Sequence, residues 1–167
     1  RAGVGHGKRQ PDSAHSAEDC LESYIISHAE KFLNKHGRRI IGWDEILDGD
    51  VAPNATVMSW RGMSGGVKAV KLGHNVIMSP DPSLYFDLYQ VKDIQNEPLA
   101  IGGYLPVSMV YKMDPVPKGL TLKEKSYING VQANLWTEYI STFKHAEYML
   151  MPRIAALSEL QWMEPKN

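Results

Sequence analysis

RIIGWDEILDGDVAPNATVMSW, residues 39–60, contains two short apolar runs that each end in tryptophan. Residues 39–43 and 56–60 are predicted strands, separated by a turn at Pro53-Asn54. A third run, VQANLW at residues 131–136, also ends in tryptophan and continues into TEY. The carboxyl ends of parallel strands gather at one mouth in a barrel. Three indole faces at such a mouth, with acids beside them, predict a pocket that can hold a sugar ring.

Helical patterns surround these runs. Apolar residues at helical spacing predict a helix that ends near Lys35, with Ser16 as its N-cap. Gly65-Gly66 precede an expected short helix at 67–72, a strand is expected at 75–79, and the last strand is expected at 128–136. Helical sequence then runs from about residue 144 to 162, with an interruption or kink at Pro152. This rhythm of strands and helices favours parallel α/β structure.

Residues 80–127 differ from the rest because proline recurs along them. A connection of this length is usually functional in a compact domain, and short helices are expected around 85–91 and 106–112. The four predicted strands are half of an eight-stranded (β/α)8 TIM barrel, which typically needs ~250 residues. The sequence therefore predicts either a small open sheet or half of a barrel.

Composition limits the possible functions. The 167 residues suffice for one domain, and the formal net charge of -1 gives no field that favours nucleic acid or an anionic membrane. No apolar run approaches the ~20 residues of a membrane span. The single Cys20 excludes an internal disulfide framework, and the six histidines have no metal-ligand spacing, so neither a metal nor a cofactor is expected. Residues 1–15 are expected to be a loop. A chain that opens on Arg1 is expected to be a piece of something longer, so no export signal need be visible.

Aromatic and acidic residues alternate at the predicted mouth. On an extended strand residues i and i+2 share a face, so Asn134, Trp136 and Glu138 are expected to point the same way. Tyr85 and Asp87 do so as well, provided that their stretch is extended. A sugar has an apolar C–H face and a rim of hydroxyls, so it calls for an aromatic plate beside a carboxylate. The alternative interpretation is that the tryptophans fill the core.

Asp44-Glu45 is a candidate acid pair. Glycosidases use two carboxylates ~5 to 9.5 Å apart, but neighbours on a strand face opposite ways. Acids directly after a strand also favour the start of a helix through its dipole. We interpret the pair as a helix start.

Several segments together carry a family resemblance. They are GRRIIGWDEIL (37–47), ATVMSWRG (55–62), YFD (85–87), GVQANLWTE (130–138) and EYMLMPRIAALSELQW (147–162). In order and spacing they closely resemble family 20 glycoside hydrolases, the β-N-acetylhexosaminidases, over roughly residues 20–163. The resemblance implies a (β/α)8 barrel, with residues 16–167 as its C-terminal half, strands five to eight.

The resemblance also implies a mechanism. In that family the 2-acetamido oxygen of the substrate attacks the anomeric carbon, which is an exception to the two-carboxylate scheme. A glutamic acid protonates the leaving oxygen, and the aspartate before it orients the acetamido group. This pair belongs to a His-x-Gly-Gly-Asp-Glu motif that does not occur in this chain, and a sugar-binding arginine of an earlier strand is also missing. Asp44-Glu45 belongs to the next strand's motif.

The resemblance assigns roles to six residues. The walls around the N-acetylglucosamine ring are implied to be Trp43, Trp60 and Trp136. Tyr85 is implied to donate its hydroxyl to the acetamido oxygen. Asp87 and Glu138 are implied to accept sugar hydroxyls, with Glu138 at O4 and O6.

The function that follows is part of an exo-β-N-acetylhexosaminidase that hydrolyses terminal N-acetylhexosamine and retains the anomeric configuration. The expected partners are N-acetylhexosamine-containing glycans and the N-terminal half of the barrel, with neither nucleic acid nor membrane. A homodimer through the exposed half-barrel faces is a further expectation. The whole enzyme is expected to be periplasmic, secreted or lysosomal, and this chain alone inactive. The alternatives are a non-catalytic carbohydrate-binding α/β module and an α/β domain without a ligand.

Overall fold

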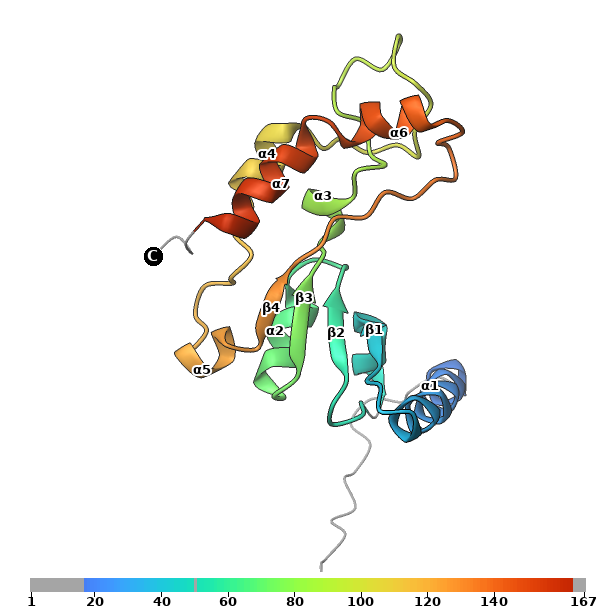
Figure 1. Cartoon of the computed structure of the whole chain (residues 1–167), viewed down its shortest axis with the longest axis vertical. Coiled ribbons are helices and arrows are strands. Elements are labelled where there is room, and N and C mark those ends of the chain that lie inside the picture. Colours follow the sequence, from blue (N-terminus) through green and yellow to red (C-terminus); the bar gives the residue numbers. More distant parts are fainter. Residues whose placement is uncertain (1–16, 50, 164–167) are drawn as a thin grey trace, which may run out of the picture.

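The structure, a computed structural model, describes residues 17–49 and 51–163. Four parallel strands form one sheet in which each strand pairs with the next in the sequence (Figure 1). The strands are β1 (Ile41–Trp43), β2 (Thr56–Ser59), β3 (Asn75–Met78) and β4 (Ile128–Val131). A parallel four-stranded sheet with flanking helices, as predicted, is confirmed.

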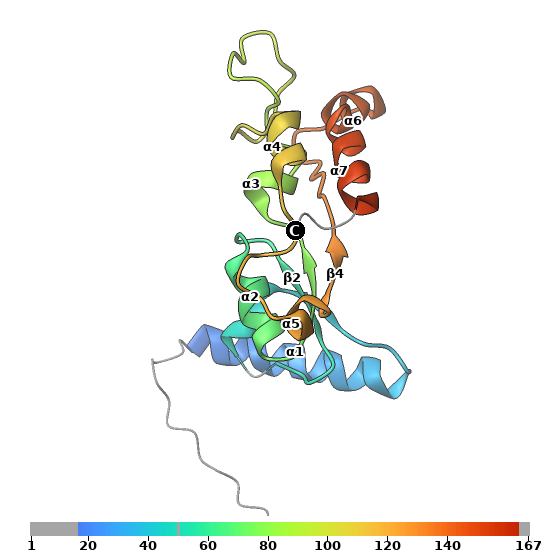
Figure 2. The same ribbon diagram turned by 90° about the vertical axis from the view of Figure 1, so that its left-hand side faces the viewer.

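Seven α-helices and one 3-10 helix connect or flank the described strands. They are α1 (Ala17–Lys35), η1 (Asp44–Asp48), α2 (Ser64–Lys71), α3 (Asp81–Leu84), α4 (Val107–Lys112), α5 (Leu122–Lys125), α6 (Phe143–Leu150) and α7 (Arg153–Trp162). Figures 1 and 2 show α4, α6 and α7 beyond the carboxyl ends of the strands, while α1 lies near β1. The long connection between β3 and β4 therefore borders the edge of the sheet at which the carboxyl ends of the strands lie.

The two faces of the sheet differ. Val57 of β2 pairs in register with Val76 of β3, and both side chains are fully buried. Helix α2 packs closely against this face at Gly66, which has no side chain. A Cβ added to Gly66 would lie 3.2 Å from Val76 Cγ1 and 2.4 Å from Met78 Cε. Met58 and Ile77, which are also register partners, are only half-buried. One face therefore belongs to the core, and the other remains partly open.

The helix expected at 85–91 is wrong, because the helical turn α3 ends at Leu84. Tyr85 instead forms an isolated parallel bridge with Asn134. The amide of Asn134 donates to the Leu84 carbonyl at 2.9 Å, and the amide of Phe86 donates to the Asn134 carbonyl at 2.7 Å. These sheet-like bonds take the backbone groups that a helix would need.

The last strand is shorter than the predicted 128–136, because β4 ends at Val131. After Val131, hydrogen bonds that involve side chains replace the backbone hydrogen bonds of the sheet. The Ser79 hydroxyl donates to the Gln132 carbonyl at 2.9 Å, and the Asn134 side-chain amide donates to the Ser79 hydroxyl at 2.9 Å. The chain therefore stays beside the end of β3 without continuing as a strand.

Other expectations are confirmed. The predicted interruption at Pro152 separates α6 from α7, and the helix expected at 106–112 is α4. Helix α5 was not predicted, although Thr121 and Glu124 form a capping box at its start. The Ser16 cap and the loop at 1–15 lie outside the described residues, and the domain boundary at residue 16 stays a prediction.

Candidate functional site

A cavity of about 510 Å³ lies at the carboxyl ends of β1 and β2. Four aromatic residues that are far apart in the sequence line it: Trp43, Trp60, Tyr85 and Trp136. Trp43 and Trp60 are half-buried and Trp136 is exposed. The prediction that the three strand-end tryptophans meet is confirmed, and the alternative that they fill the core is wrong.

The aromatic rings form a continuous wall. Trp60 and Tyr85 are stacked, with ring centroids 6.3 Å apart and an interplanar angle of 20°. Tyr85 meets Trp136 edge-on at 6.1 Å, and Trp136 is tilted against Trp43 at 6.1 Å. Offset and edge-to-face pairs of this kind are favourable arrangements for aromatic rings. The wall therefore offers indole surface in more than one orientation.

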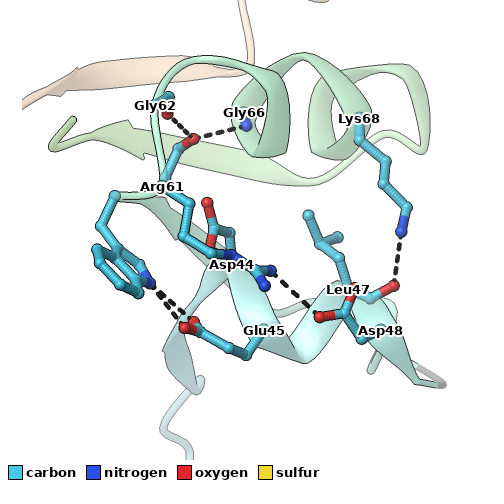
Figure 3. Close-up of polar contacts among 10 residues, drawn as sticks. Asp44, Glu45, Leu47, Asp48, Arg61, Gly62, Gly66 and Lys68 are labelled. Atoms are coloured by element: carbon cyan, nitrogen blue, oxygen red, sulfur yellow. Dashed lines mark hydrogen bonds and ion pairs between the residues drawn. The ribbon is translucent and has the colours of Figure 1, made fainter. Parts of the chain in front are cut away.

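Glu45 is a cavity residue to which the sequence analysis gave no site role. Its carboxylate accepts the Trp60 indole N–H at 2.8 and 2.9 Å, one distance to each oxygen (Figure 3). This bond fixes the indole edge at one side of the cavity. The sequence analysis considered Glu45 as one member of a candidate acid pair and interpreted the pair as a helix start.

Asp44, its neighbour, is directed elsewhere. Its side chain is buried, and its Oδ1 accepts from Arg61 Nε at 2.8 Å (Figure 3). A Cβ at Gly65, in the first turn of α2, would lie 2.4 Å from Asp44 Oδ2, so the carboxylate rests against that helix. Both acids lie in the first turn of η1, as predicted. Asp44 therefore supports the fold, while Glu45 contacts the cavity.

Tyr85 is held as a hydrogen-bond donor. Burial raises the pKa of its phenol, and the nearby carboxylates of Asp81 and Asp87 raise it further. A phenol whose pKa lies above its usual value of ~10 keeps its proton at neutral pH. Tyr85 can therefore donate its hydroxyl hydrogen to a ligand oxygen.

Asp87 is buried and incompletely bonded. Only 4% of the residue is exposed, and its Oδ1 has no hydrogen-bond partner in the part of the chain that the structure describes. Burial raises the pKa of this carboxyl, and the charge of Glu138 adds to the rise. The backbone amides of Asp87 and Trp136 oppose the shift. A buried carboxyl oxygen without a hydrogen-bond partner destabilises the folded state, so folding by itself does not explain why Asp87 is placed here.

Glu138 does not line the aromatic cavity. It borders a second cavity of about 580 Å³, formed with residues 137–141 and 98–99. Asn134, expected on the same face, is buried and bonds with Ser79. The shared face expected for Asn134, Trp136 and Glu138 required an extended strand, and this condition is not met because β4 ends at Val131. The structure thus brings four of the six predicted site residues around one cavity.

Arg153 is a further residue that the sequence analysis missed. It is fully buried and donates to the carbonyls of Phe86, Leu88, Leu105 and Met149. Burial lowers the pKa of its guanidinium to about 10. Because Phe86 and Leu88 flank Asp87, this one side chain holds the Asp87 backbone in place. The signal was an arginine within the otherwise apolar run at 149–157.

The described residues contain no group of three His, Cys, Asp or Glu side chains arranged to hold a metal ion. Within the same residues, no helix combines the length and apolar character that membrane crossing requires.

Comparison with known proteins places the chain in a family. Residues 8–165 match the model of glycosyl hydrolase family 20, catalytic domain. The chain is 51% identical over 156 residues to a β-hexosaminidase of Porphyromonas gingivalis, a match that covers 93% of this chain and 20% of that protein. It is 29% identical to a β-hexosaminidase of Vibrio furnissii, with 83% of this chain and 23% of that protein covered.

Solved structures agree with this assignment. A Vibrio harveyi exo-β-N-acetylglucosaminidase of family 20, in complex with N-acetylglucosamine, superposes with a TM-score of 0.75 at 26% identity, over 90% of this chain and 24% of that one. A Flavobacterium johnsoniae chitobiase superposes with a TM-score of 0.72 at 33% identity, over 88% and 21%. The fold is that of a partial α/β barrel. The chain spans about a fifth of the length of these relatives. It belongs to glycosyl hydrolase family 20 and forms part of its catalytic domain.

Proposed function

We propose that this chain supplies sugar-binding walls for a β-N-acetylhexosaminidase that removes terminal N-acetylhexosamine from glycans. The observation that carries the proposal is the cavity in which Trp43, Trp60, Trp136 and Tyr85 meet at the strand ends. Indole faces suit the apolar C–H face of a pyranose, and the phenol suits a carbonyl acceptor. The curated relatives named β-hexosaminidase support this choice of substrate.

In the proposed reaction the substrate provides its own nucleophile. The Tyr85 hydroxyl donates to the acetamido oxygen and orients it. As this oxygen forms a bond to the anomeric carbon, the bond from that carbon to the leaving oxygen breaks, and the leaving oxygen takes a proton from a carboxylic acid. Water then attacks the anomeric carbon and gives a proton to the carboxylate left by the acid, while the bond from that carbon to the acetamido oxygen breaks, so two inversions retain the configuration. Asp87 and Glu138 accept hydrogen bonds from sugar hydroxyls.

The acid itself is proposed to lie outside this chain. Two carboxylates line the cavity, those of Glu22 and Glu45, and the Trp60 indole N–H donates to both oxygens of Glu45. Asp44 is bound to Arg61 on the other side of η1. We therefore expect the purified chain to give no turnover of a chromogenic N-acetylglucosaminide. Turnover that disappears in Glu45→Gln would instead make Glu45 the acid.

Binding tests the proposed walls directly. Saturation-transfer NMR on the 167-residue chain should detect N-acetylglucosamine and give a much weaker signal for glucose, which lacks the acetamido group. Trp136→Ala and Glu138→Ala should each abolish the N-acetylglucosamine signal. Trp162→Ala is a matched control, because Trp162 is 90% exposed on α7. Equal signals for the two sugars, or loss in the control alone, would contradict the proposal.

A further inference from the structure

The acidic pair Asp44-Glu45 binds the two residues that directly follow β2 (Figure 3). The Trp60 indole N–H donates to the two oxygens of Glu45 at 2.8 and 2.9 Å, and Arg61 Nε donates to Asp44 Oδ1 at 2.8 Å. Asp44 is buried and Glu45 is half-buried, so water competes little for either bond. Two neighbouring carboxylates of η1 therefore hold two neighbouring side chains at the carboxyl end of β2.

The element that carries Glu45 is itself held in place by α2. The Ser59 hydroxyl accepts from the Gly66 amide at 2.8 Å, which ties the end of β2 to the start of α2. Lys68 Nζ, also on α2, donates to the Leu47 carbonyl of η1 at 2.9 Å. Helix α2 thereby connects η1 with the end of β2, and Glu45 presents its oxygens from a fixed position.

The Trp60 ring is held by two different kinds of contact. Its stack on Tyr85, with centroids 6.3 Å apart and planes 20° apart, restrains the plane of the indole. Stacking alone lets a ring slide or turn within its own plane. The bond to Glu45 restrains the direction of the indole edge, and a hydrogen bond to a charged acceptor is stronger than one between neutral groups. The position of this wall therefore depends on Glu45.

We propose that Glu45 is a positioning residue that limits the size of the acyl group accepted on the amino sugar. The inference rests on the function proposed above, in which the Tyr85 hydroxyl donates to the acetamido oxygen. Because Trp60 lies nearly parallel to Tyr85, an acetamido group bound there has its methyl group beside the Trp60 indole. An indole held by Glu45 accepts an acetyl group and clashes with a longer acyl chain, whereas an indole without this bond can move aside.

The test compares N-acetylglucosamine with N-propanoylglucosamine as ligands of the 167-residue chain, using NMR titration. Because a methylene added against a fixed apolar wall is strongly discriminated, the acetyl ligand should bind at least about tenfold more tightly. Glu45→Ala should lower this affinity ratio to less than about threefold. Glu45→Gln, whose amide oxygen still accepts the indole N–H, should keep the ratio. Glu147→Ala is the matched control, because Glu147 is exposed on α6.

The indole N–H of Trp60 gives a second readout that needs no ligand. After transfer to heavy water its NMR signal should disappear more slowly than that of Trp162, which is 90% exposed. Glu45→Ala should remove this protection, and Glu45→Gln should retain it. In a Trp60→Phe background, which keeps an aromatic ring without the donor, Glu45→Ala should leave the affinity ratio unchanged. Thermal unfolding of each variant verifies that it folds.

Each outcome decides a separate statement. An unchanged ratio in Glu45→Ala, or a ratio lost equally in Glu45→Gln, overturns the role of Glu45 and leaves the proposed function standing. A ratio that also falls in Glu147→Ala would reflect lost charge in general and refutes the inference as well. Equally fast exchange of the Trp60 and Trp162 indoles in the original chain refutes the positioning bond. Absence of binding by either sugar overturns the proposed function, and this inference falls with it.

Discussion

Replacing the buried Arg153 tests what holds the candidate site together. Arg153→Met keeps an unbranched side chain of similar length but removes every donor. The carbonyls of Phe86, Leu88, Leu105 and Met149 then lose this partner. A buried polar group left without a partner costs ~1–3 kcal/mol. Four carbonyls at the low end of that range give a loss of about 4 kcal/mol.

This loss is large against the ~5–15 kcal/mol by which small domains are stable. It is measured as the change in the free energy of unfolding, from urea titrations followed by circular dichroism. Arg39→Met is the matched control, since Arg39 is exposed and surface substitutions usually stay within ~0.5 kcal/mol. Arg153→Lys, which keeps a charge but not the fork of donors, should fall between the two. A loss below ~1 kcal/mol in Arg153→Met would refute the reasoning.

Three other predictions follow from the same structure. Because the folded pKa of Asp87 is raised, the folded state binds more protons than the unfolded state between the two pKa values, and stability falls as pH rises through that window. Asp87→Asn should therefore be more stable than the original chain at pH 7 in urea titrations, with the gain shrinking toward pH 4; a constant difference would contradict this. Gly65→Ala should lower the free energy of unfolding by ~1–3 kcal/mol, because its Cβ would lie 2.4 Å from Asp44 Oδ2; an unchanged urea midpoint would show that Asp44 yields easily. The isolated chain should self-associate, because β1 and β4 are the outer strands of the described sheet and each has one edge without a neighbouring strand. Helix α1 also exposes the apolar side chains of Leu21, Tyr24, Ile25 and Phe32. A strictly monomeric mass in light scattering at high concentration would argue against self-association.

The sheet could be predicted because its signals are local. Val57, Val76 and Met78 belong to short apolar runs bounded by turn residues, and such runs indicate buried strands whatever lies around them. The break at Pro152 was equally local, since proline lacks the amide that a helix interior needs. The meeting of Trp43 and Trp60 followed from topology, because parallel strands place their carboxyl ends together. Trp136 reaches the same cavity from the irregular segment after β4.

What the sequence did not reveal depends on pairing between distant segments. The helix expected at Tyr85 fails because Asn134 takes its backbone bonds, and nothing near residue 85 indicates this partner. Glu138 does not line the aromatic cavity because β4 ends before it. Residues i and i+2 share a face only while a strand continues. Arg153 looked like one polar residue in an apolar helix, and its importance lies in four carbonyls far from it in sequence or on the preceding turn.

The distribution of the tryptophans gives the protein a built-in optical reporter. Of the four indoles in the chain, three line the aromatic cavity and the fourth, Trp162, is 90% exposed. Emission from Trp162 should resemble that of an indole in water, so Trp162→Phe removes the background and leaves only cavity fluorescence. Trp43 and Trp136 lie 6.1 Å apart and tilted, close enough for their excited states to couple. Near-ultraviolet circular dichroism of that variant would therefore follow the geometry of the cavity itself, without an attached dye.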